Sequence, residues 1–181
     1  MLPLAESLLA TIRSEETEAA YRLEMDLMPT VLDWLMIDGG LRRLFQQHLP
    51  WVHWQAVETG MTGRGIPDLN YCARGVEGWV ECKQTTGWAV GLRPEQVAWL
   101  ARRTRAGGRC WVAVRRKCPA GPRRVVADEL WLVPGTHVVP LHREGLRAVL
   151  GDGGAQGIWV GGPAAWDWRE IAACLDLHNS V

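Results

Sequence analysis

Three residues near the middle of the chain have side chains and a spacing suited to phosphodiester hydrolysis. Asp68 follows Gly65-Ile66-Pro67, and Glu81, Cys82 and Lys83 come after twelve intervening residues. Carboxylates supply the oxygen ligands that a hard divalent cation prefers, and a lysine supplies a positive group near the attacking water or the charged transition state. This set predicts a metal-dependent hydrolytic site.

The same spacing predicts a β-hairpin that would bring these groups together. Residues 69–73 and 79–83 are strand-like, and the glycines between them suit a longer hairpin loop over residues 74–78. Residues i and i+2 of a strand point to one face, so Glu81 and Lys83 would emerge side by side, with Asp68 approaching from the neighbouring strand. The backbone carbonyl of Cys82 would add another oxygen ligand.

Each half of this pattern also has a purely structural interpretation. Glu81 and Lys83 on a strand are often only an ion pair on one face, and a Gly-x-Pro-Asp sequence is often only a turn. Their combination favours catalysis, because it is followed by a helix containing Gln96 and then by an apolar strand at residues 110–114.

Together with Leu92-Arg93-Pro94-Glu95-Gln96, the segment from Gly65 to Lys83 resembles the PD-(D/E)XK nuclease superfamily. Within it, the segment is most similar to virus-type replication-repair nucleases and phage-encoded, Holliday-junction-resolvase-like enzymes. The resemblance covers roughly residues 41–117. It implies a restriction-endonuclease-like core, a Mg²⁺ or Mn²⁺ cofactor and endonuclease activity on branched DNA of recombination or repair, and it permits a homodimer.

The resemblance also implies a role for each matching residue. Asp68 and Glu81 correspond to the metal-binding carboxylates, and Lys83 corresponds to the lysine that orients or activates water. Gln96 falls where many members carry a helical glutamine near the site.

A further acid of such a site usually comes from an earlier element. Glu58 is favoured as this metal ligand because it ends the strand before the loop, and strand ends converge on the site. Glu24, on an N-terminal helix, is the alternative.

DNA contacts must come from local clusters of charge, because the formal net charge is zero. Cations gather between residues 102 and 124, although a solvated helix face with a polar loop would show the same pattern. Trp88 lies in a loop just after Lys83 and is a candidate for base stacking. The predicted DNA-binding residues are Arg64, Trp88, Arg115, Arg116 and Lys117.

Helical and strand patterns are mixed along the chain, which predicts one α/β domain with helices packed on a mixed central sheet. An N-terminal helical segment (1–40) precedes the nuclease-like core (41–133) and a C-terminal extension (134–181). Outside the hairpin, the expected elements are helices at 14–36, 41–49, 94–106, 141–150 and 168–175, and strands at 51–57, 110–114, 130–133 and 157–160.

Several other kinds of site are disfavoured. The five cysteines lack C-x-x-C spacing, the five histidines lack zinc-site spacing, and no phosphate-binding loop motif occurs. No secretory signal or run of ~18 apolar residues is found, which predicts an intracellular, cytoplasmic protein. This prediction includes a phage-encoded protein that acts in the cytoplasm of its host.

The pattern leaves two other functions open. One is a catalytically inactive DNA-binding or interaction module that keeps the nuclease fold, and the other is a structural protein whose ion pair mimics the motif. The substrate is equally open among a four-way junction, a flap, a duplex and a single strand.

Overall fold

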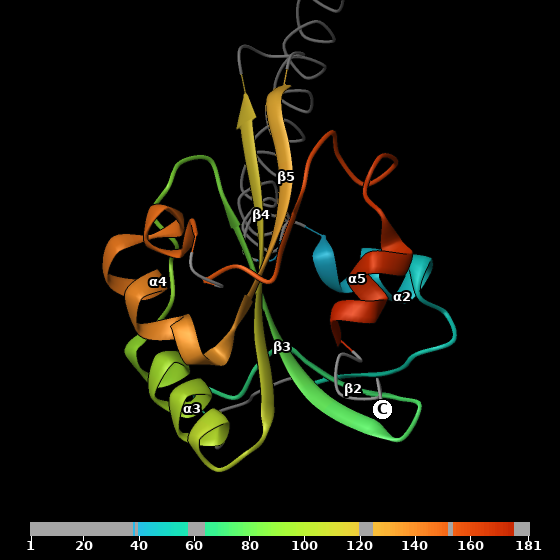
Figure 1. Cartoon of the computed structure of the whole chain (residues 1–181), viewed down its shortest axis with the longest axis vertical. Helices are drawn as coiled ribbons and strands as arrows, with labels where there is room; N and C mark the ends of the chain where they lie inside the picture. The colour runs from blue at the N-terminus through green and yellow to red at the C-terminus, as the bar shows by residue number, and fades with distance from the viewer. Residues whose placement is uncertain (1–37, 39, 58–63, 120–124, 152–153, 176–181) are drawn as a thin grey trace, which may run out of the picture. The chain divides into compact units, whose positions relative to one another are not determined.

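The computed structural model describes residue 38 and residues 40–57, 64–119, 125–151 and 154–175, all within one compact unit, Met36–Val181. In this part of the chain, a six-stranded mixed sheet has helices on both faces (Figure 1). The predicted α/β fold with a mixed central sheet is therefore confirmed. Glu24 and the predicted helix at 14–36 lie outside the described residues, as does Glu58.

The strands follow chain order across the sheet, β1-β2-β3-β4-β5-β6, and all neighbours are antiparallel except β3 and β4. The elements are α2 (Leu41–His48), β1 (His53–Ala56), β2 (Leu69–Ala73), β3 (Val76–Thr85), α3 (Pro94–Arg105), β4 (Arg109–Pro119), β5 (Val125–Pro134), the 3₁₀ helix η1 (Gly135–His137), α4 (Val138–Glu144), the 3₁₀ helix η2 (Leu146–Val149), β6 (Gly157–Trp159) and α5 (Trp168–Leu175).

The β2–β3 hairpin is tighter than its sequence predicted. Only Arg74 and Gly75 connect the strands, both with positive φ (51° and 78°), and β3 already begins at Val76. Two left-handed residues match the twist of the flanking strands better than a longer loop does. The predicted five-residue loop at 74–78 was therefore wrong.

Helix α3 makes the crossover between the parallel strands β3 and β4. Pro94 occupies its first turn, as predicted, where the missing proline N–H costs no helical hydrogen bond. A parallel pair needs such a crossover connection, so α3 has to begin just beyond the carboxyl end of β3, near the predicted catalytic residues.

Two hydrophobic clusters cover the two faces of the sheet. Helices α2 and α5 pack on one face through residues such as Phe45 and Ile171, and α3, α4 and η2 pack on the other through residues such as Leu100 and Leu141. Figure 1 shows these helix pairs on opposite sides of the strands. Because side chains alternate along β3, Cys82 joins the first cluster and Glu81 points to the α3 side.

Strands β4 and β5 extend well beyond their predicted ends at residues 114 and 130. The Arg/Pro/Gly-rich loop expected between these two strands is strand in its described parts, because opposite charges pair across β4 and β5. Arg115 makes two hydrogen bonds to Asp128 (2.8 and 2.7 Å), and Arg116 lies 2.8 Å from Glu129. Cross-strand pairs of this kind stabilise a ladder without apolar residues.

The predicted helix at 141–150 is two shorter pieces. Gly145 lies between α4 and η2 with φ 76° and ψ −162°, a conformation that a helix cannot continue through. The last helix does start after Asp167, whose carboxylate accepts the N–H groups of Arg169 and Glu170. No helix in the described residues is long and apolar enough to span a membrane.

Candidate active site

The tight β2–β3 hairpin brings Asp68 beside the β3 residues of the motif. Leu69 faces Val80 in the ladder, so one further step places Asp68 opposite Glu81. The Asp68 Oδ2 atom accepts a hydrogen bond from the Cys82 N–H at 2.9 Å. The side chains of Asp68, Glu81 and Lys83 therefore belong to one site at the amino end of β2.

Glu81 is the most deeply buried group of this site, with 0% of its surface exposed. Its Oε1 atom lies 2.7 Å from the Lys83 Nζ and also accepts a hydrogen bond from the Gln96 side-chain amide. Its other oxygen, Oε2, is buried and has no hydrogen-bond partner among the described residues. A buried polar atom without a partner is costly, so this oxygen is suited to a ligand.

Gln96 connects the site to the first turn of α3. It is 2% exposed, and besides contacting Glu81 it accepts the Arg93 N–H at 2.9 Å. Gly65, three residues before Asp68, packs directly on this turn, with φ 85° and no room for a Cβ beside the Glu95 carbonyl. The loop that carries Asp68 and the helix that carries Gln96 are thus fixed against each other.

A further carboxylate near the site, Asp38, was missed by the sequence analysis. It is 2% exposed, accepts the Gly40 N–H at 2.8 Å and lies 2.6 Å from the Arg42 Nε. Both Asp38 and Arg42 are close enough to affect the charge state of Asp68. The detectable signal was an acid four residues before an arginine at the start of a helix.

Of the two acids predicted to complete the ligand set, neither lies in the described part of the chain. Val57, the residue before Glu58, does donate its N–H to the Asp68 carbonyl at 2.9 Å. The described chain thus reaches Asp68 from two directions, through Val57 after β1 and through Asp38 before α2.

Burial raises the proton affinity of both hairpin carboxylates. Burial and the nearby Asp68 carboxylate raise the pKa of Glu81 to about 7, although Lys83 and Arg93 oppose the rise. Burial also raises the pKa of Asp68, against the Cys82 N–H, Lys83 and Arg42, and the Asp38 carboxylate adds to the rise. A buried carboxyl with a pKa near neutrality is typical of functional sites and would be stabilised as an anion by a cation.

The donor set fits a cation that keeps part of its hydration shell. No group of three or more His, Cys, Asp or Glu side chains within the described ranges has the geometry to hold a metal ion alone. Magnesium is commonly bound by one or two carboxylates plus water and substrate phosphate. Asp68 and the unpartnered oxygen of Glu81 meet that requirement.

The predicted carbonyl ligand at Cys82 also has suitable surroundings. The N–H and C=O of one strand residue point to the same side, so this carbonyl faces the edge where Asp68 lies. Continuing the ladder register would place Pro67 opposite Cys82, and proline has no N–H to donate.

The predicted DNA-binding residues are placed differently from one another. Arg64 is exposed in the loop before Asp68, whereas Arg115 and Arg116 are largely occupied by Asp128 and Glu129. Lys117 follows them on β4 and faces Asp128 in the ladder.

Trp88 is not an open stacking platform. The Arg116 and Arg147 guanidinium groups lie 4.1 and 4.9 Å from its ring centroid, and Trp131 packs against it at nearly a right angle. A base that stacks on a face covered by one of these guanidinium groups would have to displace it.

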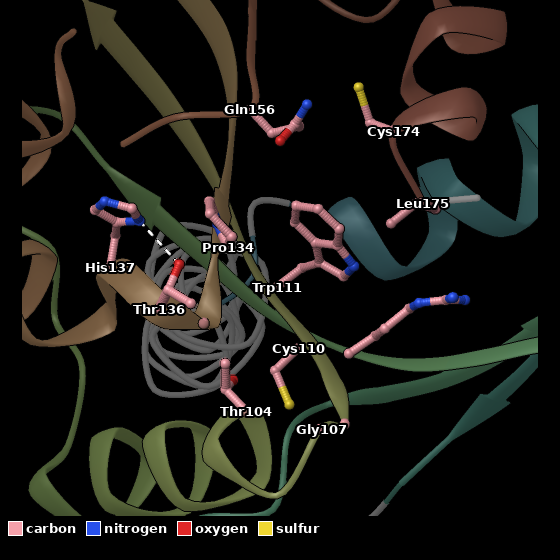
Figure 2. Close-up of a pocket in the computed structure, with 13 residues that line it drawn as sticks. Thr104, Gly107, Cys110, Trp111, Pro134, Thr136, His137, Gln156, Cys174 and Leu175 are labelled. Carbon is pink, nitrogen blue, oxygen red and sulfur yellow. Dashed lines mark hydrogen bonds between the residues drawn. The ribbon is translucent and has the colours of Figure 1, made fainter. Parts of the chain in front are cut away.

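A separate cavity of about 510 Å³ lies at the amino end of β4 (Figure 2). Its lining includes Cys110, Trp111, His137 and Cys174 but no aspartate or glutamate. Without a carboxylate it does not suit a hard cation, so it is not the centre predicted from the motif.

No family model matches this chain, and no curated protein is similar to it at a significant level.

Proposed function

We propose that this protein is a metal-dependent endonuclease that hydrolyses DNA phosphodiester bonds, with branched recombination or repair intermediates as its substrates. The observation that carries the proposal is the Glu81 carboxylate, which is fully buried, held on one oxygen by Lys83 and Gln96, and without a hydrogen-bond partner on the other among the described residues. The resemblance to PD-(D/E)XK nucleases supports the same function.

Each residue of the site has a task in this proposal. Asp68, Glu81 and the Cys82 carbonyl would hold Mg²⁺ or Mn²⁺, which would supply Lewis-acid stabilisation of the phosphate and lower the pKa of a bound water. Lys83 would orient the attacking water or stabilise charge that develops on the phosphate. Gln96 would fix the Glu81 carboxylate so that its free oxygen keeps its direction.

Asp38 is the acid that we propose in the place expected for Glu58 or Glu24. Its negative charge contributes to the raised pKa of Asp68, and its side chain is nearly fully buried. Its two oxygens already accept Gly40 and Arg42, so it would act through a bridging water or through a remaining lone pair.

One observation favours the catalytically inactive DNA-binding module instead. The Lys83 ammonium directly contacts Glu81 at 2.7 Å, which is the geometry of a plain ion pair. That module would bind DNA without binding a divalent cation. Titration calorimetry of the purified protein with Mn²⁺ separates the two functions.

The test is a cleavage panel of labelled four-way junction, flap, duplex and single-stranded DNAs with Mg²⁺ or Mn²⁺. Wild-type protein should cut, and the Glu81→Gln and Asp68→Asn variants should lose at least ~100-fold in rate. Glu77→Gln changes an exposed carboxylate on the same strand and should cut normally. Cleavage by Glu81→Gln or Asp68→Asn at the wild-type rate would remove the proposed site.

A further inference from the structure

The loop that follows β3 holds Trp88 in a defined position a short distance along the chain from Lys83 of the candidate active site. The Thr85 hydroxyl donates to the Ala89 carbonyl at 2.8 Å and accepts the Gly87 N–H at 3.1 Å. Trp88 lies five residues beyond Lys83, so the chain limits their separation to roughly 18 Å. A contact at this loop would lie within about five nucleotides of the bond cleaved at Lys83, at ~3.4 Å per nucleotide.

The junction of α4 and η2, from Gly145 to Arg147, contacts this loop at three points. The Leu146 N–H donates to the Trp88 carbonyl at 2.8 Å, and Gly145 lies so close to that carbonyl that a Cβ would not fit. The Arg147 guanidinium lies over the Trp88 ring at 4.9 Å from its centroid. The C-terminal part of the chain therefore contributes a cation to the surroundings of the site.

The two arginines at Trp88 differ in how their charge is balanced. Arg116 forms an ion pair with Glu129 at 2.8 Å, and both side chains are largely buried. Arg147 is exposed, and among the described residues no carboxylate lies within ion-pair distance of it. Of the two arginines at the Trp88 ring, Arg147 is therefore the one whose positive charge is not balanced by a described carboxylate.

We propose that Trp88 positions Arg147 to bind a backbone phosphate of the DNA strand that enters the active site. The proposal rests on the DNA-cleaving function and gives Trp88 a supporting task in place of base stacking. A guanidinium held over an aromatic ring loses less freedom when it binds phosphate than a freely rotating one, and it keeps its planar fork of donors. Recognition by such a contact is independent of base sequence.

The test measures DNA binding with Ca²⁺ in place of Mg²⁺ over a range of salt concentrations. Neutralising one phosphate contact should reduce the slope of log affinity against log salt by about 0.9, which is roughly an eightfold loss of affinity at 0.1 M salt. Arg147→Gln should show this loss on a labelled duplex. Arg143→Gln removes an exposed arginine of α4 whose guanidinium lies over no aromatic ring of the described residues, and this variant should bind DNA like wild type.

Trp88 variants test its role as a support. Trp88→Leu should reproduce the Arg147→Gln loss, the double variant should lose no more than about twofold beyond either single one, and Trp88→Phe should keep most of the affinity. Circular dichroism of each variant establishes that it is folded. Because Trp88→Leu alters a packed ring, the exposed Arg147→Gln change carries the test if Trp88→Leu unfolds.

The outcomes separate this inference from the function on which it rests. Wild-type protein that binds no DNA would overturn both. Wild-type binding with an unchanged slope in Arg147→Gln, or an equal loss in Arg143→Gln, would overturn only the phosphate contact. A Trp88→Leu loss confined to single-stranded DNA, with Arg147→Gln unaffected, would show base stacking instead.

Discussion

At the scale of single residues, the Glu81–Lys83 contact has two interpretations, and the oxygen that Lys83 does not touch separates them. A plain ion pair needs only Oε1 of Glu81, whereas Oε2 is buried without a partner among the described residues. Gln96 adds a second donor to Oε1 rather than to the free oxygen. The carboxylate is therefore held on one side and left available on the other.

Substituting Lys83 by arginine tests whether this lysine does more than balance charge. Arginine keeps the positive charge but is bulkier, has donors fixed in a plane and does not give up its proton. We predict that Lys83→Arg binds Mn²⁺ and DNA within a few-fold of wild type and cleaves at least ~100-fold more slowly. Single-turnover cleavage measures this rate. Lys117→Arg, at the only other lysine, is the matched control and should cleave normally.

The raised pKa of Glu81 predicts how the metal-free protein responds to pH. Burial raises this pKa from 4.5 to about 7, so between these values the folded state holds a proton that the unfolded state has released. Stability should therefore fall as pH rises from about 4.5 through 7, by up to about 3 kcal/mol. Urea unfolding in EDTA across pH 5–8 measures it. Glu81→Gln should remove most of this slope, and an unchanged slope would contradict the buried, proton-holding state of Glu81.

At the scale of helices and strands, the sequence predicted the hairpin and the helix that build the site because their signals are local. Alternation along β3 places Glu81 and Lys83 on one face, and Pro94 with Gln96 marks the start of α3. Asp38 was missed because Gly39-Gly40 suggested a boundary, and nothing local indicates that it lies near Asp68. Such proximity depends on packing between elements that are distant in sequence.

The extended β4–β5 hairpin was missed for a different physical reason. Arg115, Arg116, Asp128 and Glu129 are charged residues that favour a loop when each strand is considered alone. They become compatible with a ladder only as pairs, and the pairing joins residues 13 apart in the chain. The same pairing explains why the arginine cluster is less available to DNA than its sequence suggested.

Gly65 connects these elements, and its replacement by alanine tests that connection. The positive φ of 85° disfavours any side chain, and the adjacent Glu95 carbonyl leaves no room for a Cβ. Gly65→Ala should lower the free energy of unfolding by at least ~2 kcal/mol and slow cleavage, because the loop must shift and carry Asp68 away from Glu81. Gly75→Ala, with φ 78° and open space around it, should cost only ~1 kcal/mol and leave cleavage unchanged. Chemical denaturation and cleavage rates of both variants test this, and equal costs would refute close packing at Gly65.

At the scale of the whole molecule, acidic and basic side chains are equal in number, and several of them pair with each other in the described ion pairs. With a formal net charge of zero, long-range attraction of DNA is weak, so binding depends on local contacts near the site. The buried carboxylates repel one another in the metal-free protein. A bound cation would relieve this repulsion, and the stability of the whole fold should report it.

Divalent cations should therefore raise the melting temperature of the protein. A ligand that binds only the folded state at 100 times its Kd adds about 2.7 kcal/mol, which is roughly 5–10 °C for a chain of this size. The increase should be larger at pH 8 than at pH 6, since protons compete with the cation for Glu81 at a pKa of about 7.

Ca²⁺ should stabilise the fold without supporting efficient cleavage, because its bonds are longer and its geometry looser than those of Mg²⁺. Thermal melts with Mg²⁺, Mn²⁺, Ca²⁺ and EDTA measure the effect. Asp68→Asn and Glu81→Gln should lose the increase and Glu77→Gln should keep it, whereas full-rate cleavage in EDTA would show that the cation is not needed.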